Sequence, residues 1–168
     1  MNESTVRVSL AHDHDRLDQL LETYRQLKRV DFAKAKQAFR EFKFGLQRHI
    51  ISEETIFFPL FEDKTGMREH GPTAVMRAEH REIGRRLEAL HDKVRCQDMD
   101  SEREEEALLQ ALFAHNQKEE NVLYPAIDRL SSAEEKADAL RKMQDLPEEA
   151  YRHCCPDSAE SAQIGPGE

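Results

Sequence analysis

Apolar residues recur at steps of three and four positions along four stretches of the chain. The stretches contain Leu10, Leu17 and Leu21, then Phe42, Leu46, Ile56 and Leu60, then Met76, Ile83 and Leu87, and finally Leu108, Leu112, Val122 and Ala126. This spacing is typical of the buried face of a bundled helix, and short connections favour antiparallel neighbours. The pattern predicts an all-α fold, an antiparallel up-down-up-down four-helix bundle.

Local signals mark the ends of these helices and predict one more. Residues typical of helix N-termini precede the second, third and fourth helices: Asp31, Gly71-Pro72, and Ser101 with Glu104 as a capping box. Ser132 with Glu135 predicts a shorter fifth helix, which runs to about Leu146 and is closed by Pro147. Five helices are therefore expected.

Six polar residues interrupt the apolar seams, and they recur at a fixed interval. His14 and His80, His49 and His115, and Glu53 and Glu119 are each 66 positions apart. Apolar neighbours such as Leu21 and Leu87 keep the same offset. The chain therefore contains two copies of one helical hairpin, about Val6 to Gly66 and Pro72 to Leu130, in a pseudo-two-fold arrangement.

The six residues predict a binuclear metal site. A buried carboxylate needs a compensating charge, and none of the seams carries a Lys or Arg. His and Glu four residues apart lie on one helix face, so one helix can present both to the same metal pair. We assign His14, His49, His80 and His115 as terminal ligands and Glu53 and Glu119 as bridges. Core histidines hydrogen-bonded to glutamates are the alternative, which six residues in two-fold register disfavour.

Imidazole and carboxylate without thiolate fit iron, manganese or zinc, and two bridging glutamates suit a di-iron or mixed iron–manganese centre. If His14 and His49 serve one metal, His80 and His115 serve the other. Each metal then keeps an open position for O2, NO, peroxide or azide.

Composition limits the class of protein and its surroundings. The formal charge of −9 disfavours a nucleic-acid partner, and no apolar run approaches the length of a membrane span. Three cysteines, Cys96, Cys154 and Cys155, do not form a disulfide framework, so we expect a cytoplasmic protein. Residues 1–130 are expected to form the bundle, and residues 131–168 a C-terminal helix and a disordered tail. The adjacent tail thiols are either unremarkable or a redox or metal-transfer handle.

The six residues, together with Phe58-Pro59 and Tyr124-Pro125 after each His-x-x-x-Glu, resemble the hemerythrin-like, His-His-Glu cation-binding family. The resemblance covers about Leu10 to Leu130. It implies a four-helix bundle around a non-haem di-iron centre with an oxo or hydroxo bridge, which meets O2 or related molecules. The oxygen carriers of the family have a further His where this chain has Met76, and Asp where it has Glu119. The resemblance therefore points away from reversible O2 carriage.

Other candidates are weaker. His12 is expected to point away from the seam, and His70 could reach a vacant position from a loop. Tyr124 and Phe58 either wall the metal pocket or pack the core, and packing is favoured. Met76 either lines the ligand route or fills the core.

The favoured hypothesis is a di-iron protein that reacts with O2, NO or peroxide for sensing, binding or scavenging. The alternative is a di-iron oxidoreductase that reduces peroxide or NO or repairs iron centres, which requires a redox partner. A third hypothesis is an adaptor with a structural metal. The sequence leaves open whether the protein is an enzyme.

Overall fold

The structure is a computed structural model that describes residues 5–152. Its α-helices are α1 (Val6–Leu27), α2 (Phe32–Ser52), α3 (Phe58–Thr65), α4 (Pro72–Arg95), α5 (Glu102–Lys118), α6 (Tyr124–Leu130) and α7 (Ala133–Gln144). Two π-helical turns, η1 (Glu53–Phe57) and η2 (Glu119–Leu123), join α2 to α3 and α5 to α6, and a 3₁₀ turn spans Glu148–Ala150. The prediction of an all-helical fold is confirmed. The tail with Cys154 and Cys155 lies outside the described residues.

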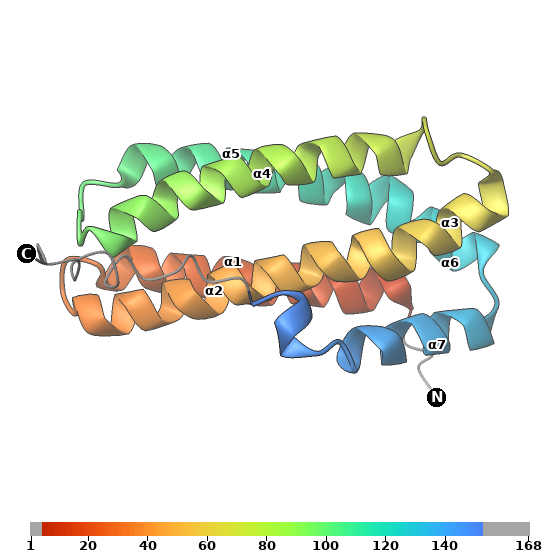
Figure 1. Ribbon diagram of the computed structural model, residues 1–168, viewed down its shortest axis with the longest axis horizontal. Helices are drawn as coiled ribbons and strands as arrows, with labels where there is room; N and C mark the ends of the chain where they lie inside the picture. The colour runs from red at the N-terminus through yellow and green to blue at the C-terminus, as the bar shows by residue number, and fades with distance from the viewer. Residues whose placement is uncertain (1–4, 153–168) are drawn as a thin grey trace, which may run out of the picture.

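The long helices lie lengthwise beside one another (Figure 1). Helix α1 packs along α2, and α4 packs along α5. Asp128 of α6 ties the two halves together, because its carboxylate accepts from the backbone N–H of Val6 at 2.8 Å and of Arg7 at 3.0 Å. These N–H groups have no partner within their own helix, so Asp128 satisfies the start of α1. Across residues 5–152, no helix is long and apolar enough to cross a membrane.

The two π-helical turns change which residues are buried after them. A strict α-helical seam predicts Ile56 and Leu60 in one half and Val122 and Ala126 in the other. Instead, the buried residues are Phe57, Phe58 and Phe61 in the first half and Leu123, Tyr124 and Ile127 in the second. Val122 is 61% exposed. The predicted residues Ile56, Leu60 and Ala126 pack at the edge of the core, and the prediction is wrong for Val122. The wider turn of a π-helix rotates the following residues and so shifts the centre of the buried face.

Most of the predicted helix starts are confirmed. The Asp31 side chain accepts from the Lys34 N–H, and Ser132 forms a capping box with Glu135. The capping box predicted at Ser101 is wrong, although the helix does begin there. The Ser101 hydroxyl donates instead to the Glu105 carboxylate, at 2.6 Å. This side chain is used in a buried cluster rather than in a cap.

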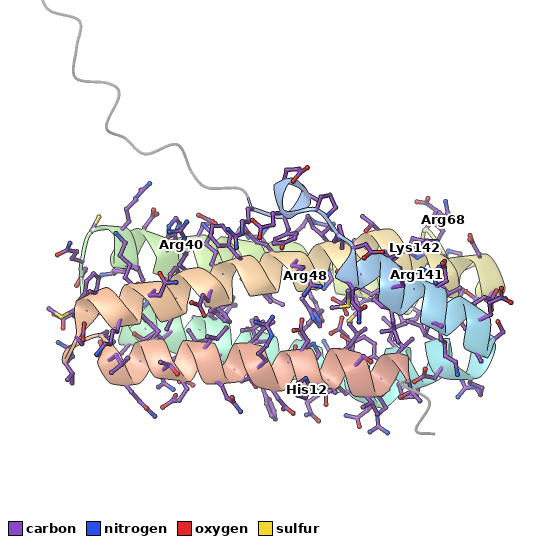
Figure 2. The ribbon with its side chains drawn as sticks, turned by 90° about the horizontal axis from the view of Figure 1, so that it is seen from below. His12, Arg40, Arg48, Arg68, Arg141 and Lys142 are labelled. Atoms are coloured by element: carbon purple, nitrogen blue, oxygen red, sulfur yellow. The ribbon has the colours of Figure 1, made fainter. Side chains whose placement is uncertain are left out.

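Helix α7 covers the first half of the bundle near η1. It ends at Gln144, two residues before the predicted Leu146. Ala139 and Met143 join the apolar cluster around Phe57 and Phe58. Arg48 of α2 lies beside the end of α7 (Figure 2) and donates to the Met143 carbonyl oxygen at 3.0 Å.

Two apolar clusters fill the core and leave a polar layer between them. One cluster includes Leu17, Leu46, Ile83 and Leu112, and the other includes Leu10, Phe57, Met76 and Leu123. On each of the four long helical segments, the predicted ligands lie between members of these two clusters. The polar layer is therefore enclosed by apolar side chains on both sides.

A second buried polar group, the lysine cluster, consists of Tyr24, Lys28, Ser101 and Glu105. The Lys28 ammonium donates to Glu105 at 2.5 Å and to Ser101 at 3.2 Å. Tyr24 and Ser101 share a hydrogen bond of 3.1 Å, and Arg25 donates to the other Glu105 oxygen at 3.2 Å. The buried carboxylate is thus paired with a cation of the chain itself.

Candidate metal centre

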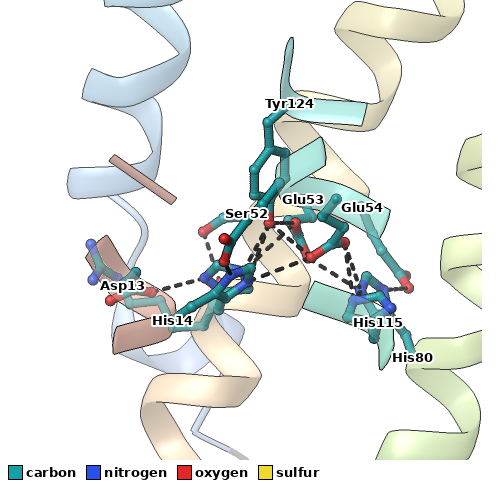
Figure 3. A network of polar contacts seen from close by, with 12 residues as sticks. Asp13, His14, Ser52, Glu53, Glu54, His80, His115 and Tyr124 are labelled. Carbon is teal, nitrogen blue, oxygen red and sulfur yellow. Dashed lines mark hydrogen bonds and ion pairs between the residues drawn. The ribbon is translucent and has the colours of Figure 1, made fainter. Parts of the chain in front are cut away.

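The structure brings together all six residues predicted as ligands. His14, Glu53, His80 and His115 are labelled in Figure 3. Each of them is at most 4% exposed. Their ligand atoms form two groups within 4.8 Å: Glu53, His80, His115 and Glu119, and His14, His49 and Glu119. The six residues come from four separate helical segments, and Glu53 and Glu119 each open a π-helical turn. We call these six residues the centre.

Each of the four imidazoles has a carboxylate on its outer nitrogen. The Nδ1 atoms of His14, His49, His80 and His115 lie 2.7, 2.9, 2.8 and 3.0 Å from Glu120, Asp13, Glu54 and Glu79 respectively. A carboxylate only accepts, so each Nδ1 carries the proton and each Nε2 faces inward. This is the arrangement by which acidic partners orient histidine ligands of metals.

The inward nitrogens meet in pairs. The Nε2 atoms of His14 and His49 are 3.0 Å apart, and those of His80 and His115 are 3.1 Å apart. With every Nδ1 protonated, two neutral rings would direct two lone pairs at each other. Each pair therefore needs a positive charge between its rings, either a proton or a metal ion.

In the protein alone, protons supply that charge. Burial opposes protonation of His49, but the nearby Glu53 and Asp13 carboxylates raise its pKa to about 10. Burial likewise opposes protonation of His80, while the nearby Glu53 and Glu54 carboxylates raise its pKa to about 9. Burial favours the neutral form of Glu53, yet the His49 and His80 charges hold its pKa well below the usual range. Metal ions that bind imidazole nitrogens displace such protons.

Two buried carboxylate oxygens point into the centre with no hydrogen bond from any of residues 5–152: Glu53 Oε2 and Glu119 Oε1. They are nevertheless close to imidazole nitrogens, at 3.2 Å from His80 Nε2 and 3.0 Å from His115 Nε2. The distances suit hydrogen bonds, but the directions do not. Atoms that converge on a common point without bonding to one another are typical of a cation site.

Sequence reasoning missed five residues around the centre. Four are the outer carboxylates, Asp13, Glu54, Glu79 and Glu120, and the fifth is Tyr124. The same interval of 66 positions relates Asp13 to Glu79 and Glu54 to Glu120, so the repeat contained the signal. The sequence allows Tyr124 either to wall the metal pocket or to pack the core and favours packing, but its hydroxyl lies 2.5 Å from Glu53 and 2.8 Å from Glu119. Burial and these carboxylates raise the pKa of Tyr124 well above its usual value.

The other candidates lie elsewhere. His12 and His70 are exposed, and neither belongs to the metal-compatible groups formed by the described residues. Met76 is 3% exposed and packs in the apolar cluster with Leu10 and Phe57. Cys96 is exposed.

The donor set fits iron. Four imidazole nitrogens and two carboxylates without thiolate suit a metal of intermediate hardness, and the unpaired oxygens of Glu53 and Glu119 are available to it. A groove of about 500 Å³ between α1 and α5 reaches this region, lined by His14, Asp15, Asp18 and Asn116 among others. Beneath it, a cavity of about 10 Å³ touches three imidazoles and has room for one water-sized molecule.

Comparison with known proteins agrees with the resemblance seen in the sequence. The family described as Hemerythrin HHE cation binding domain matches residues 6–127. A curated relative, the iron-sulfur cluster repair protein YtfE of Edwardsiella ictaluri (strain 93-146), is 47% identical over 45 residues. The match covers 27% of this chain and only 20% of that protein. No solved structure matches the chain significantly.

Proposed function

Because this chain belongs to the hemerythrin HHE cation-binding family, we propose that it is a non-haem di-iron protein that reacts with O2, NO or peroxide. Its task is sensing, binding or scavenging of that molecule. One iron is held by His14 and His49 and the other by His80 and His115, with Glu53 and Glu119 between them. The cofactor is an iron pair with an oxo or hydroxo bridge, and a mixed iron–manganese pair is the alternative.

One observation carries this proposal. Four imidazoles turn their Nε2 atoms inward because each Nδ1 forms a hydrogen bond with a carboxylate. In addition, two inward carboxylate oxygens accept no hydrogen bond from the described residues. A structural polar network satisfies its buried groups internally. Here the inward atoms are nearly all acceptors, which is what a pair of cations requires.

The residues around the centre orient the ligands, exclude water and give small molecules access. When bound, the irons supply open coordination positions and one-electron chemistry. Asp13, Glu54, Glu79 and Glu120 keep the four rings in the tautomer that presents Nε2. The two apolar clusters exclude bulk water, and the groove between α1 and α5 admits small molecules. We also propose the up-down-up-down order, the division at residue 130, and a cytoplasmic setting.

A second candidate is an oxidoreductase of the iron-centre repair type. The 45-residue match to an iron-sulfur cluster repair protein favours it. It requires a redox partner, whereas a binding protein does not. Steady turnover of NO or peroxide with a cellular reductant would favour the oxidoreductase.

The ligand assignment is tested by counting metal. Glu53→Gln and Glu119→Gln should each abolish loading of two irons, since a neutral amide is a poor bridge. Glu62→Gln is the matched control, because Glu62 is equally buried and pairs with Arg77 away from the centre. Two irons per chain in both centre variants would refute the bridging assignment.

The reaction class is tested by spectroscopy. The protein is loaded anaerobically with ferrous iron, mixed with O2 and then degassed. A coloured adduct that disappears on degassing indicates reversible binding. Irreversible conversion to diferric bands favours a redox sensor or an oxidising enzyme, which the replacement of a further His by Met76 leads us to expect.

A further inference from the structure

The six duplicated ligands give the two halves of the centre the same kinds of donor. Around His80 and His115, ligand atoms of both Glu53 and Glu119 lie within 4.8 Å of one another. Around His14 and His49, Glu119 joins the two rings within the same span, and Glu53 Oε1 lies 3.6 Å from His49 Nε2. Any difference between the halves must therefore come from other residues.

The Tyr124 hydroxyl lies in the half formed by His14 and His49. Its oxygen is 3.3 Å from the Nε2 atoms of both His14 and His49. It is also 2.5 Å from Glu53 Oε1 and 2.8 Å from Glu119 Oε2, so it stands among all four donor atoms available there (Figure 3). The single hydroxyl proton serves one of these carboxylates at a time. Tyr124 is fully buried, and the π-helical turn η2 directly before it sets its direction.

The equivalent position in the first repeat carries no oxygen. Phe58 is 66 positions before Tyr124 and stacks on His80, with ring centroids 5.6 Å apart and planes at 10°. Tyr124 faces His14 at a similar 5.9 Å. The two rings thus occupy related places, and only one of them brings a donor atom to the metal region.

We propose that Tyr124 is a ligand of the iron held by His14 and His49. This inference rests on the proposed function and makes the two irons inequivalent. Ferric iron favours anionic oxygen donors, and binding of the Tyr124 oxygen to it releases the hydroxyl proton to solvent. The His80 and His115 half offers no such oxygen, because Phe58 stands at the equivalent position, so an iron held there would keep the open position for the small molecule.

A tyrosine oxygen bound to ferric iron produces a visible charge-transfer band, which neither imidazole nor carboxylate ligands produce. Ferric protein should show this band, and Raman excitation within it should enhance tyrosine ring vibrations. Tyr124→Phe should bind two irons and lose the band. Tyr24→Phe is the matched control, because Tyr24 is equally buried but belongs to the lysine cluster, and it should keep the band.

The outcomes separate this inference from the proposed function. Two results would overturn the assignment of Tyr124 and leave the di-iron function standing. One is an unaltered protein with two irons and no tyrosine-enhanced Raman bands, and the other is a set of tyrosine-enhanced bands that survives Tyr124→Phe. An unaltered protein that takes up no iron would overturn both. If Tyr124→Phe does not fold, the Raman spectra of the unaltered protein, Tyr24→Phe and Tyr151→Phe decide the question, since the chain has only three tyrosines.

Discussion

The centre and the lysine cluster are two buried polar groups in one bundle, and they balance their charge differently. In the lysine cluster, Lys28 contacts Glu105 directly, and hydrogen bonds from Ser101 and Arg25 satisfy the rest of that carboxylate. In the centre, carboxylates and imidazoles face one another, and two oxygens accept no hydrogen bond within the described part of the chain. The first group contains a lysine that balances its carboxylate, whereas the second has a set of inward acceptors that suits a metal ion.

This difference gives a criterion for reading buried polar groups. Burial and charge are similar in both, because Glu105 is 1% exposed and Glu53 and Glu119 are 0% exposed. What separates them is the balance of donors and acceptors. A structural network supplies a donor for each buried acceptor, while a metal site directs acceptors at one another.

The largest expected effect is the loss of stabilisation by metal. A ligand that binds only the folded state at a thousandfold excess over its Kd adds about 4 kcal/mol to the free energy of unfolding for each site. Ferrous iron should stabilise the unaltered protein by an amount of this order for each ion, and Glu53→Gln should lose most of the gain. Urea unfolding with and without iron, under anaerobic conditions, measures it. Equal gains in both proteins would place the iron outside the centre.

Removal of the Lys28 charge from the lysine cluster should have the next largest effect on the free energy of unfolding. Lys28→Met leaves Glu105 buried without its nearest positive charge, and breaking a buried ion pair costs about 3–5 kcal/mol. The urea midpoint should fall while two irons still bind. The double variant Lys28→Met/Glu105→Leu is the control, because an apolar pair recovers most of this stability. A single variant as stable as the unaltered protein would contradict the role given to Lys28.

The sequence predicted the centre better than its surroundings. The interval of 66 positions identified His14, His49, Glu53 and their counterparts, because imidazoles and carboxylates are rare on an apolar seam and are conspicuous when they repeat. The same interval also marked Asp13 and Glu79, but in the sequence an acidic residue next to a ligand looks like an ordinary surface residue. Only the Nδ1 contacts reveal their role.

The fold was predicted least well where the backbone leaves the regular α-helix. Nothing in the residues after Glu53 distinguishes a π-helical turn from an α-helical one, so Ile56 was placed on the core seam and Phe57 was not. The capping box at Ser101 failed for a different reason. Lys28 is far away in the sequence, and its charge recruits Ser101 and Glu105 into the lysine cluster.

Substitution of an outer carboxylate should lower the metal affinity moderately, and it tests each half of the centre separately. Asp13→Asn acts on His49, and Glu79→Gln acts on His115. Loss of such a partner typically lowers metal affinity 10–100-fold, about 1.4–2.7 kcal/mol. Competition with a chelator of known affinity measures it. The exposed Glu82→Gln is the control, and an affinity unchanged in both test variants would show that these carboxylates do not orient the rings.

The smallest effect should be on the rate of iron uptake, and it tests whether the centre is filled from solution through the groove. Asp15 and Asp18 line the groove between α1 and α5, whereas their counterparts in the other repeat are Arg81 and Gly84. The groove therefore carries two carboxylates that have no counterpart in the other repeat. Asp18→Asn should slow ferrous iron uptake by a few-fold at low ionic strength, because charge at a binding mouth raises association rates and salt screens it.

Stopped-flow measurement at two salt concentrations separates this effect from a change in affinity. The number of irons bound at the end should remain two, since Asp18 is not part of the centre. Glu102→Gln is the matched control, because Glu102 is an exposed carboxylate that contacts Lys28 at 2.9 Å in the lysine cluster. If both variants take up iron at the rate of the unaltered protein, the cations reach the centre by another path. If only Asp18→Asn takes up iron slowly, and added salt removes the difference in rate from the unaltered protein, the acidic groove speeds the entry of iron into the centre. The lysine cluster contains its own cation and has no such requirement.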